Sequence, residues 1–97
     1  MYGTVMTATL VGTVEQVRAV AEEWAQKRQV PGFRREEVLV SDDGRSLVVA
    51  VFFDSREDYQ RLADDPGQDT WWSEQMSPLV SDVSWTDGSW QPPLTAG

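Results

Sequence analysis

The chain contains no cysteine, no histidine and no asparagine. The absence of cysteine excludes disulfides, thiolate nucleophiles and cysteine-ligated metals. The absence of histidine excludes an imidazole base, a Ser-His pair, a histidine-ligated metal and a proximal histidine for haem iron. Most familiar catalytic constellations are therefore missing, and we expect a protein that uses no metal and no other cofactor.

Basic residues and long apolar runs are also scarce. Eight Lys and Arg residues stand against 16 Asp and Glu residues, which gives a net charge of −8. Such a charge repels phosphate backbones over most of the surface, so we expect no nucleic-acid partner. No apolar run approaches the roughly 20 residues that span a bilayer, and residues 1–4 contain no basic region. We therefore expect a soluble, cytoplasmic protein without membrane contact.

The most apolar stretch is the run from Leu47 to Phe53, seven residues rich in β-branched and aromatic types. It is too short for a membrane span and has no helical period, which indicates a strand covered on both faces. One layer of helices covers only one face of a sheet, so a second sheet or a second subunit must cover the other. We predict a homodimer, with Val49, Val51 and Trp85 at its interface.

The remaining pattern predicts a single ferredoxin-like α+β domain over residues 1–90, followed by a flexible tail over residues 91–97. Thr13 and Gln16 form a capping box before an amphipathic helix, and Ser55 with Asp58 caps a second helix. Asp43-Gly44 indicates a hairpin turn. The predicted order is β-α-β-β-α-β, an antiparallel sheet with helices on one face. Its strands cover residues 4–11, 33–40, 47–53 and 80–90, and its helices residues 14–28, 56–63 and, capped by Asp69-Thr70, 71–76.

At these positions the chain resembles the antibiotic biosynthesis monooxygenase-like family of dimeric α+β barrels. The resemblance rests on three segments and covers the chain except its tail: Val30-Pro31-Gly32-Phe33, Phe53-Asp54-Ser55-Arg56-Glu57-Asp58-Tyr59, and Trp71-Trp72 running into Pro78-Leu79. It implies a homodimer whose sheets pack face to face, with a ligand cavity in each subunit between sheet and helices. Some members oxidise polycyclic aromatic metabolites without metal or flavin, and relatives degrade haem.

The family's site residues do not carry over to this chain. Members commonly place an Asn on the first strand, a Trp on the second helix and, in the haem enzymes, a His shortly after. Here the first strand offers Thr7 and Thr9, the matching part of the second helix reads Tyr59-Gln60-Arg61-Leu62, and the next Trp along the chain is Trp71. Because the chain has no histidine, we do not expect haem degradation, and the resemblance leaves only a cavity of the same general kind.

A set of large side chains could line that cavity and stack on a flat organic ligand. The alternative is that they only fill the core. Neighbouring positions on a helix point about 100° apart, so we expect one of Trp71 and Trp72 to reach a rim or an interface. We assign Trp85 and Trp90 to sheet packing or the interface. The predicted pocket residues are Met6, Trp24, Phe33, Tyr59, Trp71, Trp72 and Met76.

Among the titratable residues, Tyr59 is the catalytic candidate, because a buried phenol can position or exchange a proton with a hydroxyaromatic substrate. Lys27, Arg28, Arg34 and Arg35 could guide an anionic ligand, or could be a solvated helix end and strand edge. Adjacent acidic pairs such as Glu36-Glu37 diverge in direction, so we expect no carboxylate dyad. Two functions stay open: a cofactor-independent monooxygenase of secondary metabolism acting on an aromatic or hydrophobic small molecule, and a non-catalytic binding or dimeric interaction module.

Overall fold

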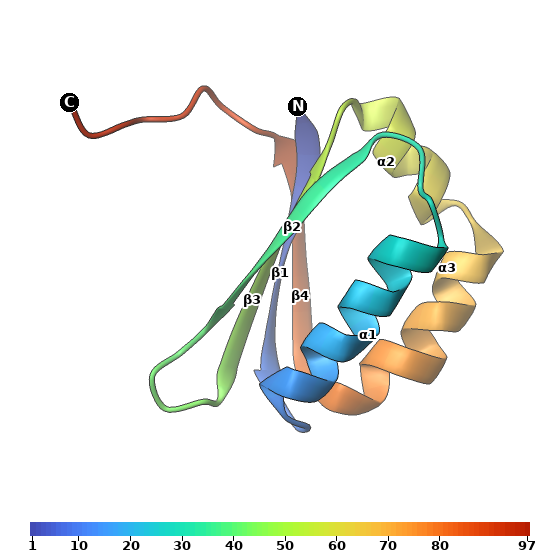
Figure 1. Ribbon diagram of the computed structural model, residues 1–97, viewed down its shortest axis with the longest axis vertical. Helices are drawn as coiled ribbons and strands as arrows, with labels where there is room; N and C mark the ends of the chain where they lie inside the picture. Colours follow the sequence, from blue (N-terminus) through green and yellow to red (C-terminus); the bar gives the residue numbers. More distant parts are fainter.

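A computed structural model describes all 97 residues and consists of one antiparallel sheet with its helices on one face (Figure 1). The sheet has the order β2-β3-β1-β4, so the two strands next to each other at its centre, β3 and β1, belong to different halves of the chain. The strands are β1 (Tyr2–Leu10), β2 (Phe33–Val40), β3 (Ser46–Phe53) and β4 (Val80–Ser89), and the helices are α1 (Val14–Lys27), α2 (Arg56–Ala63) and α3 (Pro66–Trp71). The predicted ferredoxin-like fold is confirmed.

Helix α1 begins where its capping signal predicts. The Thr13 side chain accepts a hydrogen bond from the backbone N–H of Gln16, and the Gln16 side chain accepts one from the backbone N–H of Thr13. This reciprocal pair satisfies N–H groups that have no partner within the helix. Val17, Ala21 and Trp24 recur at helical spacing and are buried against the sheet. The helix therefore carries Trp24 into the space between helices and sheet.

Strand β3 divides its apolar residues between the two faces of the sheet. Leu47, Val49 and Phe53 are almost completely buried on the helix-covered face, where Val51 also lies. Val48, Ala50 and Phe52 point to the opposite face, which no helix covers (Figure 1). The interface assignment of Val49 and Val51 therefore differs from the structure, which turns both towards the helices. The seven consecutive apolar residues contain no alternation of polar and apolar types, so the sequence does not indicate which side chains face the helices.

The connection from β3 to β4 is longer and more helical than the sequence pattern indicates. Ser55 caps α2 as predicted, but α3 begins at Pro66 and is capped by Asp65, whose side chain accepts from the N–H of Gly67. The prediction of a cap at Asp69-Thr70 is therefore wrong. Proline favours the first turn of a helix as readily as it ends one, and here it does both. A π-helical turn (Trp72–Met76) and a 3-10 turn (Ser77–Leu79) complete the connection.

The uncovered face of the sheet carries a small stacked cluster at one end. The Phe52 ring stacks on Trp90 at 4.2 Å between centroids, and the Arg35 guanidinium lies 4.0 Å from the Phe52 ring centre. Trp90 therefore packs on the sheet, as the sequence predicts. Residues 91–97 follow it without regular secondary structure and extend away from the domain (Figure 1). No helix is long and apolar enough to cross a membrane.

Candidate functional site

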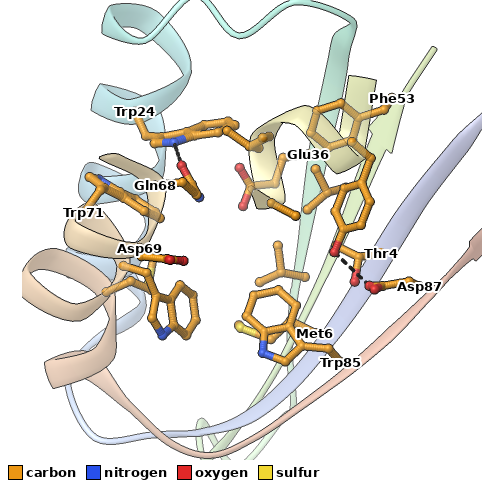
Figure 2. A pocket seen from close by; sticks show the side chains of 17 residues that line it. Thr4, Met6, Trp24, Glu36, Phe53, Gln68, Asp69, Trp71, Trp85 and Asp87 are labelled. Carbon is orange, nitrogen blue, oxygen red and sulfur yellow. Dashed lines mark hydrogen bonds between the residues drawn. The ribbon is translucent and has the colours of Figure 1, made fainter. Parts of the chain in front are cut away.

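A cavity of about 460 Å³ lies between the sheet and the helices (Figure 2). Its walls combine strands β1, β2, β3 and β4 with helices α1, α2, α3 and the π-helical turn. The lining comprises 17 residues of three kinds. The aromatic ones are Trp24, Phe53, Tyr59, Trp71, Trp72 and Trp85, the aliphatic ones are Met6, Val49, Val51, Leu62, Ala63 and Met76, and the polar ones are Thr4, Glu36, Gln68, Asp69 and Asp87.

Four tryptophans form a continuous series of ring contacts along the cavity. Ring centroids lie 5.9 Å apart for Trp24 and Trp71, 6.4 Å for Trp71 and Trp72, and 5.0 Å for Trp72 and Trp85. Trp24 is held further by a hydrogen bond of 2.8 Å from its Nε1 to Oε1 of Gln68. Such contacts leave ring faces and edges available to a planar ligand in a position fixed by the fold.

Trp71 and Trp72 both line the cavity, although only one was expected to face inwards. They lie at the junction where α3 ends and the π-helical turn begins. Trp71 reaches towards Trp24 on α1, and Trp72 reaches towards Trp85 on β4. The two side chains do point in different directions, but the cavity is wide enough to be lined by both. Trp85, assigned from sequence to the interface, consequently also belongs to the cavity wall and is about half exposed.

Tyr59 forms the most defined polar contact of the site. Its hydroxyl donates a hydrogen bond of 2.8 Å to Oδ1 of Asp87 on β4 (Figure 2). Partial burial of the phenol, together with this carboxylate acceptor, raises the pKa of Tyr59 to about 12. At neutral pH the phenol is therefore protonated, so Tyr59 can donate a proton or pass one on, but it is not a base by itself. Its ring is fixed against Phe53 and Tyr2, each at 5.5 Å between centroids.

Glu36 places a second carboxylate in the cavity from the edge strand β2. It pairs with Val51 in the sheet, and its side chain points into the cavity (Figure 2). Burial raises the pKa of the Glu36 carboxyl, and no cation or hydrogen-bond donor opposes that effect. Its neighbour Glu37 points to the opposite face and pairs with Arg35 at 3.8 Å. The two members of this acidic pair diverge, as predicted.

The four clustered basic residues lie outside the cavity lining, and each is paired with a carboxylate. Lys27 contacts Glu23 at 3.0 Å, Arg28 contacts Asp65 at 2.7 Å, and Arg34 contacts Asp54. The fourth, Arg35, contacts Glu37 and Phe52 on the uncovered face. This arrangement fits a solvated helix end and a guarded strand edge. It does not fit a funnel for an anionic ligand.

The structure brings six of the seven predicted pocket residues together around the cavity. Phe33 is the exception, because its ring packs edge-on against Trp24 at 5.1 Å and against Phe53 at 5.9 Å, behind the cavity wall. Sequence reasoning missed the polar members of the lining, namely Thr4, Glu36, Gln68, Asp69 and Asp87. Glu36 could have been found, since it is two and four residues from Val38 and Val40 on the same side of β2. No group of three or more acidic side chains is placed to hold a metal ion.

Comparisons with known proteins find similarity at the level of structure alone. No family model and no curated protein sequence matches the chain. A cofactor-independent oxygenase from Streptomyces nogalater, SnoaB, is 20% identical with a TM-score of 0.78, covering 98% of this chain and 97% of that one. A monooxygenase from the gene ActVA-Orf6 of Streptomyces coelicolor, solved with the ligand nanaomycin D, is 18% identical with a TM-score of 0.73, covering 99% and 92%.

A third similar structure is a dimeric ferredoxin-like protein from Thermobifida fusca, 14% identical with a TM-score of 0.56, covering 89% of each chain. All three cover most of this chain and most of their own length, so the likeness concerns the whole domain. The chain therefore has the ferredoxin-like α+β fold of the antibiotic biosynthesis monooxygenase-like proteins, as the sequence predicts.

Proposed function

We propose that the protein is a small cofactor-independent monooxygenase that oxidises a flat, polycyclic aromatic or similarly hydrophobic metabolite in the cavity. The observation that carries this proposal is the open, tryptophan-walled cavity with the Tyr59–Asp87 hydrogen bond at its wall. A core filled by its own side chains would instead favour a non-catalytic module. The fold shared with a cofactor-independent oxygenase and a monooxygenase adds support.

The cavity matches a planar ligand in size and in lining. Its volume of about 460 Å³ falls within the roughly 300–1,000 Å³ typical of small-molecule sites. The four tryptophans supply apolar ring surface, and the few polar groups are confined to defined points of the wall. Stacking on such rings contributes about 0.5–1.5 kcal/mol per aromatic pair beyond burial of area. A fused-ring compound can therefore bind with its reactive carbon and oxygen substituents near the polar points.

In the proposed reaction the substrate itself reduces oxygen. A hydroxyaromatic substrate of the anthrone kind loses a proton to form an electron-rich anion, which transfers an electron to O₂. The resulting radicals combine in a C–O bond, and the hydroperoxide formed after protonation loses water to leave a ketone. One O₂ is consumed, one oxygen atom enters the product, and the other leaves as water with the two hydrogens of the oxidised carbon. The protein's part is to form the anion, orient it and keep bulk water away.

Tyr59 and Asp87 can remove the initial proton together. A substrate hydroxyl that donates a hydrogen bond to the Tyr59 oxygen is linked through Tyr59 to Asp87, because the Tyr59 hydroxyl donates its own hydrogen bond to Asp87. Transfer along both hydrogen bonds leaves Asp87 protonated and Tyr59 neutral, so the phenol never has to ionise against its high pKa. Asp87 is exposed and can then release the proton to solvent.

We also propose that two copies associate through the uncovered sheet faces. That face presents Val5, Val48 and Ala50 without a covering layer, and Leu39 on its edge strand is 65% exposed. A similar structure is described as dimeric, which supports a dimer in this fold. Burying such apolar area against its own copy removes it from water without requiring another partner.

Replacement of Tyr59 by Phe tests the function, because it keeps the ring and removes only the hydroxyl. We expect Tyr59→Phe to leave indole fluorescence quenching by an anthrone- or naphthol-like compound nearly unchanged. Oxygen consumption should fall by about 100-fold, the lower range of general acid–base contributions. The matched control is Tyr2→Phe, since Tyr2 packs beside Tyr59 but lies outside the cavity lining.

Three outcomes decide between the candidate functions. Turnover that is equal in wild type and Tyr59→Phe removes Tyr59 from the mechanism. Quenching without oxygen consumption for a broad panel of aromatics favours a non-catalytic binding module of the same fold. If no aromatic compound quenches or is oxidised, the small-molecule function is wrong and an interaction module remains.

A further inference from the structure

The cavity contains negative charge that no positive charge balances. Glu36, Asp69 and Asp87 all line it, while none of the chain's eight lysines and arginines does. Asp87 has one hydrogen bond, from a neutral phenol. Asp69 and Asp87 are exposed to solvent, whereas Glu36 is partly buried, and a buried carboxylate loses hydration unless donors or cations lie beside it. The cavity wall supplies neither to Glu36.

Glu36 is the most instructive of the three carboxylates. It is a charged residue on the helix-facing side of the sheet, where its neighbours on β2 and β3 are valines. The next residue, Glu37, lies exposed on the opposite face and is paired with Arg35, so the two carboxylates have different surroundings. The pKa of Glu36 is raised by burial without any compensating partner within the protein. Such a side chain is costly to the fold, and a cationic ligand in the cavity would supply the partner that the protein lacks.

The aromatic lining strengthens the same preference. A cation within about 6 Å of a tryptophan face is attracted by the ring quadrupole, and tryptophan is the most effective of the aromatic residues in this role. Here four tryptophans and three carboxylates face one volume of about 460 Å³. Carboxylates and tryptophan faces both stabilise a positive charge. A positive charge on the substrate would also offset the negative charge that the proposed reaction develops on its rings.

We propose that the ligand of this cavity is a planar hydrophobic molecule that carries a protonated amine, and that Glu36 is the residue that pairs with the amine. This inference names the substrate class of the site proposed above and relies on that proposal for the ligand's location and aromatic part. A neutral hydroxyaromatic compound can donate hydrogen bonds to the same carboxylates, but it lacks the direct attraction between opposite charges that an ammonium group has. An aromatic carboxylate is repelled by all three.

The charge preference can be measured by binding alone, with three compounds of nearly equal size. At neutral pH 2-naphthylmethylamine is a cation, 2-naphthylmethanol is a neutral donor, and 2-naphthoate is an anion. Calorimetric titration of each into the wild-type protein at physiological salt should give the tightest binding for the amine. We expect an advantage of about tenfold or more over the alcohol, and weaker binding still for the carboxylate.

Two single substitutions assign the preference to the cavity. Glu36→Gln keeps the shape and removes the charge, so the advantage of the amine over the alcohol should fall by about tenfold. Glu37→Gln changes the net charge of the protein equally but lies on the opposite face of the same strand, so it should leave that advantage intact. Physiological salt limits the range of the overall −8 charge to about 8 Å, which keeps distant charges from producing the effect.

The proposal is overturned if the alcohol or the carboxylate binds as tightly as the amine, or if none of the three binds. It is also overturned if Glu36→Gln and Glu37→Gln change the amine's advantage equally, since the preference would then come from net charge. None of these readouts requires turnover. A protein that consumes no oxygen can still rank the three compounds as expected, and one that oxidises neutral aromatics can still fail to prefer the amine.

Discussion

Replacing Glu36 by Gln should stabilise the protein at neutral pH. The side chain is mostly buried on the helix-facing side of β2, and its carboxylate has no partner to offset the loss of hydration. Glutamine is nearly the same shape and carries no charge. The substitution therefore removes an unfavourable burial while leaving the neighbouring packing in place.

The sign of the effect with pH follows from the direction in which folding moves the pKa. Folding raises the pKa of the Glu36 carboxyl, so the folded protein binds this proton more strongly than the unfolded chain. Below the unfolded pKa the carboxyl is protonated in both states and costs nothing. As pH rises through the folded pKa, the carboxyl ionises in the folded protein as well. The free energy of unfolding is then lower by about 1.4 kcal/mol for each tenfold increase in proton affinity that folding causes. In a domain of this size, 1.4 kcal/mol corresponds to a melting temperature change of roughly 6–11 °C.

Thermal unfolding of wild type, Glu36→Gln and Glu37→Gln between acidic and neutral pH measures this directly. The melting temperature of Glu36→Gln should exceed that of wild type at neutral pH, and the difference should shrink towards zero as pH falls. Glu37→Gln should show no such pH-dependent gain, because Glu37 is exposed on the other face. A difference between wild type and Glu36→Gln that is absent at neutral pH, or constant over the whole range, would refute the reasoning.

Three further experiments test other parts of the structure. Val48→Asp should leave the fold intact and weaken self-association in sedimentation. Val49→Asp should unfold the protein, because it places an unpaired charge in the core. Equal effects of the two substitutions would contradict their assignment to opposite faces of the sheet. Gly3→Ala should lower the melting temperature by several degrees, because a Cβ at this position collides with the Val51 carbonyl oxygen. Gly88→Ala is the control, since Gly88 has open space around it, and equal melting temperatures of the two variants would contradict the close approach at Gly3. Deleting residues 91–97 should change the melting temperature by no more than a few degrees, and a larger loss would show that the tail packs on a partner.

Local signals in the sequence predict most of the fold. Thr13 and Gln16 cap α1 as expected, and Asp43-Gly44 lies in the turn between β2 and β3, where Gly44 has a φ of +76°. These motifs depend on residues close in the chain, so their geometry is set by neighbours that the sequence displays. The predicted cap at Asp69-Thr70 is wrong because α3 already begins at Pro66, and a proline that ends one helix can also begin the next.

The candidate site was only partly predictable because its polar contacts depend on tertiary packing. Tyr59 and Asp87 are 28 positions apart and meet only when α2 packs on the central strands β1 and β3, next to β4. Whether Glu36 points into the cavity depends on which side of β2 the helices cover. The sequence does not predict that side, because Leu39 adds an apolar residue to the side opposite Glu36. Periodicity therefore predicts that residues share a face, but it does not predict what lies opposite them.

The central claim, that this cavity monooxygenates an aromatic substrate without a cofactor, is tested most directly with oxygen-18 gas. Purified protein free of metal and flavin is incubated with an anthrone, and the product is analysed by mass spectrometry beside Tyr59→Phe and protein-free controls. We expect faster product formation than in either control, with one labelled oxygen atom from O₂ in each product molecule. Product formed no faster than in the protein-free control, or product whose new oxygen comes from water, would contradict the claim.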